Sequence, residues 1–183
     1  AQGNRPPLEV LNPWSFTAPL APALAAEREG RRVTRAEVTD WLRGQAAAAE
    51  LLLVEGAGGL LSPLGSDFDL RDLVADRRAK VTPAAPTRLG ALNQILLPLE
   101  ALPPRVRRTA VAVLMNPPRT TLVSRTNAAF LRERLGAGRL TEFPWLGAGW
   151  AGQPLPPRAR KSLATVAALL NALPAARCSH FTR

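Results

Sequence analysis

A short apolar run that ends in a carboxylate and glycines most constrains the fold of this chain. Leu51 to Leu64 reads LLLVEGAGGLLSPL. The run is too short for a helix, and its abrupt change to glycines predicts a strand buried on both faces, with a loop at its carboxyl end. Since ligands bind beyond the carboxyl ends of strands in open α/β sheets, Glu55 is expected at the mouth of a crevice. Taken alone, EGAGG is equally typical of a turn in which Glu55 only caps or is solvated.

Helical and strand patterns alternate along the rest of the chain. Thr34 and Glu37 form a capping-box pattern that predicts a helix over residues 35–48. Further helices are expected over residues 91–102, which Pro98 weakens, over residues 124–135 with Ser124 as cap and Gly136 as terminator, and over residues 158–173. Strands are expected over residues 109–115 and 140–143, and loose loops at Pro103-Pro104 and Pro154–Pro157. The alternation indicates an α/β fold with a mostly parallel sheet flanked by helices.

Length and composition favour one globular domain over residues 1–183. The chain is 46% hydrophobic, and no apolar stretch approaches the roughly 20 residues of a membrane span. We therefore expect no transmembrane helix. The first residues, AQGNRPPLEV, are typical of neither a signal peptide nor a natural start. The single cysteine, Cys178, permits no internal disulfide, so a reducing cytoplasm is the predicted location. Cys178 and the single histidine, His180, lie in a tail over residues 174–183 that is expected to be disordered.

The net charge of +10 permits a polyanionic partner but does not specify one. It results from 24 basic and 14 acidic residues. Only Lys80 and Lys161 are lysines, the chain has no tyrosine, and no basic run is interleaved with aromatic residues. A preference for arginine and alanine throughout the chain accounts for the charge, and we expect no nucleic-acid partner.

Five blocks of sequence occur in an order that identifies a family. They are Asn12-Pro13-Trp14-Ser15-Phe16 with Pro19 and Pro22, Leu53-Val54-Glu55-Gly56-Ala57-Gly58-Gly59 with Pro63-Leu64, Leu89-Gly90-Ala91-Leu92-Asn93, Asn116, and Phe143-Pro144-Trp145-Leu146. Together they resemble dethiobiotin synthetase, an ATP-dependent ligase of biotin biosynthesis. The resemblance extends from Asn12 to about residue 170 and implies a P-loop NTPase-like fold.

Two parts of the family pattern are not found in these 183 residues. The family begins with a strand and a Gly-rich turn ending in Gly-Lys-Thr, which holds the ATP phosphates. The only Lys-Ser pair, Lys161-Ser162, lies in a predicted helix, and the family's Lys-Pro-x-x-x-Gly segment is also missing. We therefore expect the domain to lack its first strand and its P-loop, and we expect this chain alone to form no dethiobiotin. Ala21-Pro22-Ala23 stands where relatives often carry Ser-Pro-His, which leaves the substrate contacts there open.

The resemblance implies the formation of a cyclic urea from 7,8-diaminononanoate, CO₂ and ATP. CO₂ adds to one amine, ATP phosphorylates the carbamate, and the second amine closes the ring with loss of phosphate. Glu55 is the implied Mg²⁺ ligand, because Mg²⁺ prefers carboxylate and phosphate oxygens. The loop Gly56, Ala57, Gly58 and Gly59 is expected beside the metal and the phosphates. No side chain is assigned as a catalytic group.

The resemblance also assigns two binding segments. Residues Leu89, Gly90, Ala91, Leu92 and Asn93 begin a helix whose free N–H groups suit the substrate's tail carboxylate, and in the family they act across a homodimer interface. Alternatively, Asn93 only caps its own helix. Asn116 suits the edge of adenine, and Pro144, Trp145 and Leu146 are expected to enclose the base, although Trp145 fits a plain core position nearly as well.

Two other classes of protein remain open. A non-catalytic remnant without a P-loop, or a dimerising interaction module, is compatible with the same blocks. A basic nucleic-acid binder rests on the charge alone. The coding sequence upstream of Ala1 separates the enzyme from the remnant. A Gly-rich loop ending in Gly-Lys-Thr or Gly-Lys-Ser there favours the enzyme, and a start codon favours the remnant.

Overall fold

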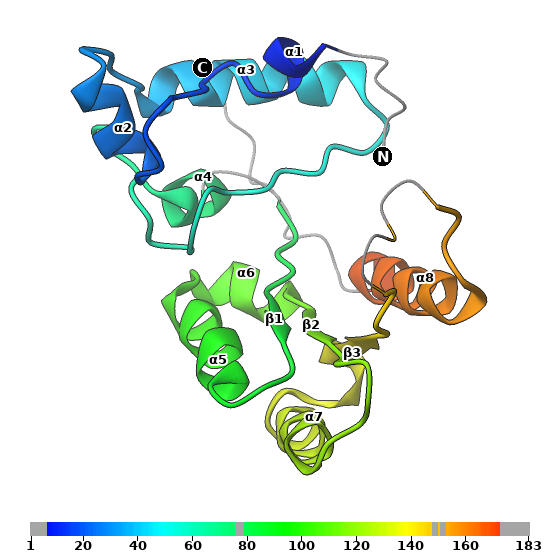
Figure 1. Ribbon diagram of the computed structural model, residues 1–183. Coiled ribbons are helices and arrows are strands. Elements are labelled where there is room, and N and C mark those ends of the chain that lie inside the picture. Colours follow the sequence, from blue (N-terminus) through cyan, green and yellow to red (C-terminus); the bar gives the residue numbers. More distant parts are fainter. Residues whose placement is uncertain (1–6, 76–78, 148–149, 151–152, 173–183) are drawn as a thin grey trace. The chain divides into compact units, whose positions relative to one another are not determined.

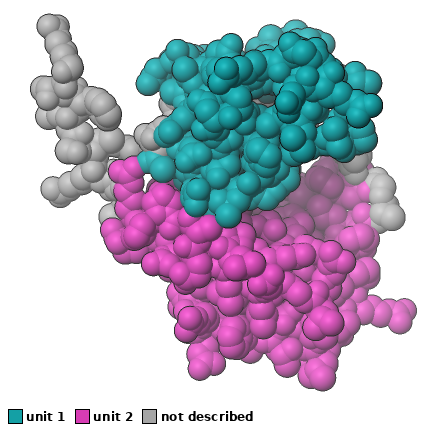
Figure 2. Space-filling view, turned by 90° about the vertical axis from the view of Figure 1, so that its left-hand side faces the viewer, with its two compact units in different colours: residues 1–77 teal, residues 78–183 magenta. Residues whose placement is uncertain are grey.

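The computed structural model describes residues 7–75, 79–147, 150 and 153–172. The chain divides into two compact units, residues 1–77 and residues 78–183, which are coloured separately in Figure 2. The expected tail over residues 174–183, with Cys178 and His180, lies outside the described residues. No helix in the described ranges is both long enough and apolar enough to cross a membrane.

Unit 1 is helical in its described part (Figure 1). Its helices are α1 (Leu8–Leu11), α2 (Pro22–Arg28), α3 (Arg35–Ala48) and α4 (Leu70–Ala75). The predicted helix over residues 35–48 is confirmed as α3, together with its capping box. The Thr34 backbone N–H donates to Glu37 Oε2 at 2.8 Å, and the Glu37 backbone N–H donates to Thr34 Oγ1 at 3.3 Å. This exchange satisfies two backbone donors at the start of the helix.

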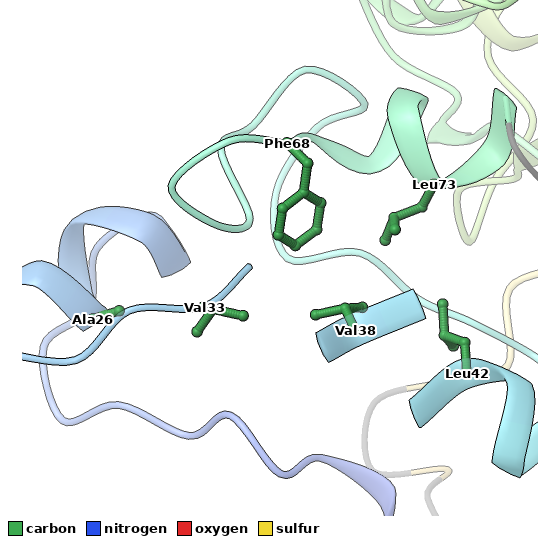
Figure 3. Packing of buried hydrophobic residues seen from close by; sticks show 6 residues of the cluster. All are labelled: Ala26, Val33, Val38, Leu42, Phe68 and Leu73. Atoms are coloured by element: carbon green, nitrogen blue, oxygen red, sulfur yellow. The ribbon is translucent and has the colours of Figure 1, made fainter. Parts of the chain in front are cut away.

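One apolar cluster holds unit 1 together (Figure 3). Val38 and Leu42 lie one turn apart on α3, so both side chains face the same side of the helix and meet Phe68 and Leu73. Gly65 permits this packing, because a Cβ atom there would lie 2.1 Å from the Phe68 ring. The cluster of buried residues consists of Ala26, Val33, Val38, Leu42, Phe68 and Leu73.

The predicted strand at residues 51–54 is wrong. These residues form no strand, and the side chains of Leu51, Leu53 and Val54 are 77%, 85% and 53% exposed. Only Leu52 packs against the apolar cluster of unit 1. A strand requires a hydrogen-bonded neighbour, and the described strands of the chain pair only with one another. Apolar sequence without a pairing partner therefore leaves this run irregular and, apart from Leu52, exposed.

Unit 2 contains a three-stranded parallel sheet flanked by helices (Figure 1). The strand order is β1-β2-β3. The elements are β1 (Ala84–Pro86), α5 (Ala91–Ala101), α6 (Pro104–Thr109), β2 (Ala112–Met115), α7 (Leu122–Leu135), the 3₁₀ turn η1 (Ala137–Arg139), β3 (Leu140–Phe143) and α8 (Pro157–Ala172). The expected α/β fold with a parallel sheet is confirmed in this unit.

The two faces of the sheet pack against different helices. Val113 and Phe143 form an apolar cluster with Ala159, which lies on α8. Since side chains alternate across a strand, the neighbouring residue Leu114 points to the opposite face and is fully buried there. Helix α5 contacts β1, α7 contacts β3, and α5 and α7 contact each other. This arrangement follows from right-handed crossovers that advance in one direction along the sheet.

Three predicted elements differ from the structure by more than one residue. The strand expected over residues 109–115 begins only at Ala112, because the chain up to Thr109 forms α6. The Pro103-Pro104 pair is not a loose loop: Pro103 is the N-cap of α6 and Pro104 its first residue. Proline suits that position, since its fixed φ is helical and its missing N–H would be unpaired there.

Helix α7 begins earlier than expected. Its N-cap is Thr121, whose Oγ1 accepts from the Ser124 backbone N–H at 3.1 Å, while Ser124 Oγ accepts from the Thr121 backbone N–H at 2.8 Å. Ser124 is thus the reciprocal partner at the third helical position and not the cap itself. The predicted end at Leu135 before Gly136 is confirmed. Helix α5 continues through Pro98 to Ala101.

Two cationic side chains in unit 2 donate hydrogen bonds to backbone carbonyls near the ends of helices. Arg139 donates to the Ala110 carbonyl at 3.0 Å and to the Arg107 carbonyl at the end of α6. Burial, and secondly the nearby charge of Arg107, lower the pKa of the Arg139 guanidinium. Lys80 donates to the Leu170 carbonyl in the last turns of α8, where a cation also interacts favourably with the helix dipole.

The capping box gives a pH-dependent prediction for unit 1. The pKa of Glu37 is lowered, first by the hydrogen bond from the Thr34 side chain and then by the one from the Thr34 backbone. The associated stability is present above the pKa of the unfolded state and is lost as the pH falls through the lower folded value. We expect Thr34→Ala to raise the pKa of Glu37 in an NMR titration and to lower the thermal midpoint more at pH 7 than at pH 3. Thr126→Ala is the control, and an unmoved Glu37 titration would contradict the assignment.

A second prediction concerns the buried hydroxyl of Thr141. Its Oγ1 has no hydrogen-bond partner within the described part of the chain, and the residue is 7% exposed. Because an unpaired buried hydroxyl is destabilising, Thr141→Val should raise the free energy of unfolding by up to about 1 kcal/mol. Thr109→Val is the matched control, since it removes a hydroxyl that donates to the Val106 carbonyl at 3.1 Å. A lower urea midpoint for Thr141→Val than for the unmodified chain would show that this hydroxyl is satisfied.

Candidate functional site

The carboxyl ends of the three strands bring polar residues together in unit 2. The register places Pro86 opposite Met115, and Met115 opposite Phe143. Pairing continues one residue further, because the Thr87 backbone N–H donates to the Met115 carbonyl at 2.9 Å and the Asn116 backbone N–H donates to the Phe143 carbonyl at 2.8 Å. The residues that follow the strands are therefore held by backbone hydrogen bonds.

Four side chains form one hydrogen-bonded chain across this edge, which we call the Asn116 network: Thr87, Asn116, Glu142 and Arg132. Thr87 Oγ1 donates to Asn116 Oδ1 at 3.3 Å, and Asn116 Nδ2 donates to Glu142 Oε2 at 3.1 Å. Glu142 Oε1 in turn forms an ion pair with Arg132 of α7. The sequence prediction identified only Asn116 among these residues.

Strand alternation explains why Glu142 takes part in this network. Thr141 and Phe143 are buried, and Phe143 packs toward α8, so the side chain of Glu142 points to the other face of β3. That face is the one contacted by α7, which carries Arg132. One feature of the sequence could have identified Glu142 as a site residue. It is the only charged residue in a four-residue strand whose other members, Leu140, Thr141 and Phe143, are buried.

The network fixes the orientation of the Asn116 amide. An ionised carboxylate only accepts hydrogen bonds, so Glu142 must face the Nδ2 group. The amide oxygen then faces the Thr87 hydroxyl, which can donate to it. Among the residues that the structure describes, one amide hydrogen and one oxygen lone pair of Asn116 have no partner and remain for a ligand, and the residue is half-buried.

The residues after β3 have different environments. Trp145 is 53% exposed, so the alternative that it is a plain core residue is wrong. Leu146 packs against the cluster of Val113, Phe143 and Ala159, and Pro144 is half-buried. An exposed indole next to the strand end leaves a large aromatic face available for stacking.

The predicted carboxylate-binding segment is a helix start. Gly90 is the N-cap of α5 with φ of 91°, a left-handed conformation that favours glycine, and it provides no side-chain cap. Leu89 is 90% exposed and Ala91 is fully buried. Asn93 is exposed at the third helical position, so the alternative that it is the N-cap is wrong. Asn127 of α7 holds the preceding turn by donating to the Arg88 carbonyl at 3.1 Å.

Glu55 and its glycine loop belong to unit 1. Glu55 is exposed and follows the irregular run of residues 51–54, not a strand. Gly58 has φ of 85°, and the Ser62 backbone N–H donates to the Gly59 carbonyl at 3.0 Å, which closes a turn. Across the described ranges no cluster of three or more histidine, cysteine, aspartate or glutamate side chains is positioned to hold a metal ion. Gly56 and Ala57 lie in the same irregular loop.

Unit 1 also contains an open hollow of about 520 Å³ near the first sequence block. The Thr17 backbone N–H donates to Glu29 Oε1 at 2.7 Å, which holds the chain against the end of α2. Arg31 lies over the Phe16 ring at 4.8 Å from its centre. The hollow is lined by Thr17, Ala18, Pro19, Leu20, Arg28 and Glu29.

Comparison with known proteins places these features in a family. A family model described as an AAA domain matches residues 2–148, which is most of the chain. The chain belongs to this AAA-domain family. The match includes the Glu55 loop, the start of α5, Asn116 and the residues after β3 up to Leu146.

The AAA-domain chain is also similar to curated proteins named ATP-dependent dethiobiotin synthetase. It is 49% identical over 96 residues to the protein of Anaeromyxobacter sp. strain Fw109-5, which covers 52% of this chain and 43% of the relative. It is 48% identical over 89 residues to that of Gloeobacter violaceus, covering 49% and 39%. The protein of Acidiphilium cryptum is 36% identical over 138 residues, covering 73% and 60%. The resemblance found in the sequence blocks is confirmed, and the chain spans less than two thirds of these relatives.

Proposed function

We propose that this chain provides the base-binding and substrate-binding part of a dethiobiotin synthetase. The proposed reaction is the ATP- and Mg²⁺-dependent closure of a cyclic urea from 7,8-diaminononanoate and CO₂. The Asn116 network is the observation that carries the proposal, because it presents a fixed amide beside an exposed indole at the ends of a parallel sheet. Relatives that bear the synthetase name support the same reaction.

Asn116 and Trp145 have complementary roles in the proposed nucleotide site. The free donor and acceptor of the Asn116 amide match the edge of adenine, while Trp145 offers its face to the ring. Pro144 and Leu146 complete the wall on either side of the indole. Such a site is mostly apolar with a few fixed polar groups, as is usual for small-molecule sites.

Glu55 is the proposed Mg²⁺ ligand. A site of one exposed carboxylate fits this ion, since Mg²⁺ is commonly held by one or two carboxylates together with phosphate oxygens and water. When bound, the ion would neutralise charge on the transferred phosphoryl group. The chain's own contribution is to hold the carboxylate at the start of the glycine loop, which leads into the turn closed by the Ser62 N–H and the Gly59 carbonyl.

The start of α5 is the proposed site for the tail carboxylate of the diamine. The positive end of an 11-residue helix favours an anion, and the exposed Leu89 and Asn93 leave this end accessible. The Ala91 N–H donates to the Arg88 carbonyl at 3.0 Å, so the N–H groups of Leu92 and Asn93 would serve the ligand. Residues 89–93 would serve the substrate of the partner subunit in a homodimer. Sedimentation of the purified protein with and without substrate measures this association.

The base site is tested on the purified chain with ligand-observed NMR. These 183 residues contain no Gly-Lys-Thr or Gly-Lys-Ser phosphate loop. We therefore expect adenosine and ATP–Mg²⁺ to bind with similar, weak affinity, within about a factor of three of each other, and no dethiobiotin to form. Asn116→Ala should weaken both at least about fivefold, through the loss of a hydrogen-bonding group.

The control variant is Asn171→Ala, which removes an exposed amide at the other end of the unit-2 sequence, on α8. Micromolar ATP binding that far exceeds adenosine binding would contradict the proposal and reveal a separate phosphate site. No adenosine binding at millimolar concentration would show that the Asn116 network is not a base site and would favour the non-catalytic alternative.

The metal role is tested by Glu55→Gln in a protein that contains this chain and has synthetase activity. A neutral amide replaces a carboxylate poorly as an Mg²⁺ ligand, so kcat at saturating Mg²⁺ should fall at least about a hundredfold. The circular dichroism should not change, because the Glu55 side chain is exposed. Glu50→Gln, in the exposed segment just before, is the matched control. A nearly normal rate for Glu55→Gln would contradict the metal-binding role and indicate that Glu55 is a solvated turn residue.

A further inference from the structure

We infer that Glu142 is a positioning residue that makes the Asn116 site select adenine over guanine. The inference rests on the proposed base site and adds to it the group that determines which base is accepted. It follows from the order of donors and acceptors along the Asn116 network, which runs Thr87, Asn116, Glu142, Arg132.

The chemistry of the two neighbours permits only one orientation of the Asn116 amide. If the amide turned by 180°, its oxygen would face Glu142 Oε2 at a distance of about the present 3.1 Å. Two acceptors would then oppose each other, and the carboxylate has no proton to donate. Thr87 would not prevent the turn, since its hydroxyl can either donate or accept. Glu142 is therefore the member of the network that excludes the turned amide.

A fixed amide distinguishes the two purines because they present opposite patterns. Adenine has an amino donor at position 6 and an acceptor at N1, whereas guanine has an oxygen acceptor at position 6 and a donor at N1. An amide in one orientation matches only one of these pairs when the base is held in one place. An amide that turns freely matches both. Selection therefore depends on the group that prevents the turn.

The surroundings of Glu142 keep it in place as an acceptor. Its other oxygen pairs with Arg132, and its side chain is 30% exposed, so it is held between α7 and β3. Its backbone carbonyl accepts from Ser162 Oγ of α8 at 2.8 Å, which restrains β3 from the opposite face. The Glu142–Arg132 pair is comparable in type to the exposed pair of Glu100 with Arg107. Only the former has a carboxylate that also contacts an amide at the strand ends.

The test compares adenosine and guanosine binding to Glu142→Gln in the full chain, by saturation-transfer NMR titration. Glutamine keeps the size of the side chain but can donate or accept, so Asn116 becomes free to turn. We expect the unmodified chain to prefer adenosine by about tenfold or more, and Glu142→Gln to reduce this ratio to about twofold, mainly through tighter guanosine binding. Glu100→Gln, which removes the carboxylate from the comparison pair, should leave the ratio unchanged.

A second measurement reports the network without any ligand. The two Nδ2 protons of Asn116, assigned with Asn116→Ser, should shift in the ¹H–¹⁵N spectrum of Glu142→Gln and not in that of Glu100→Gln. The same spectra show whether each variant is folded. A merely structural role of Glu142 would change stability without changing the ratio of the two affinities.

The outcomes separate the inference from the proposed function. If the unmodified chain prefers adenosine and Glu142→Gln keeps that ratio, the base site stands and the role of Glu142 is overturned. If the unmodified chain binds neither nucleoside, the base site itself is overturned, and the inference with it. Unshifted Asn116 Nδ2 signals in Glu142→Gln would also overturn the positioning role, whatever the affinities.

Discussion

The pairing of β2 with both of its neighbours is the interaction on which the candidate base site depends. Each backbone hydrogen bond contributes only about 1 kcal/mol, but the bonds fix the register of three strands at once. In this register the strand ends at Pro86, Met115 and Phe143 lie opposite one another. Residues far apart in the sequence are thereby brought within hydrogen-bond distance, and the Asn116 network is a direct consequence.

The same requirement for a partner explains the run before Glu55. Leu51, Leu53 and Val54 have a composition that suits a buried strand, yet they are exposed where no neighbouring strand pairs with them. Apolar sequence favours burial only if another surface is there to cover it. Position and pairing, more than composition, therefore decide whether the Glu55 loop sits at a strand end.

The arginine-rich composition contributes to the internal structure of both units. Arg31 lies over the Phe16 ring, Arg139 binds two carbonyls at the end of α6, and Arg132 pairs with Glu142. Each of these three guanidinium groups has a partner in its own unit, and no two of the three residues are adjacent in the sequence. These three guanidinium groups therefore contribute to the packing and hydrogen bonding of their own units.

Much of the secondary structure of both units was predictable from the sequence, because local signals determine where helices begin and end. The capping box at Thr34, the terminating Gly136 and the short strand over residues 140–143 each depend on neighbouring residues, and all three are confirmed. The boundaries of β2 and α7 were missed by a few residues. The residues before β2 form α6, which begins at Pro104, and α7 begins after the N-cap Thr121 instead of after Ser124.

The sequence by itself determined the family blocks, the parallel α/β alternation and the polar character of Asn116. Only the tertiary structure decided that Glu142 and Arg132 join Asn116, and that residues 51–54 form no strand. The physical reason is that a capping or turn signal acts within a few residues, whereas strand pairing and side-chain contacts across β2 and β3 depend on the register between distant segments.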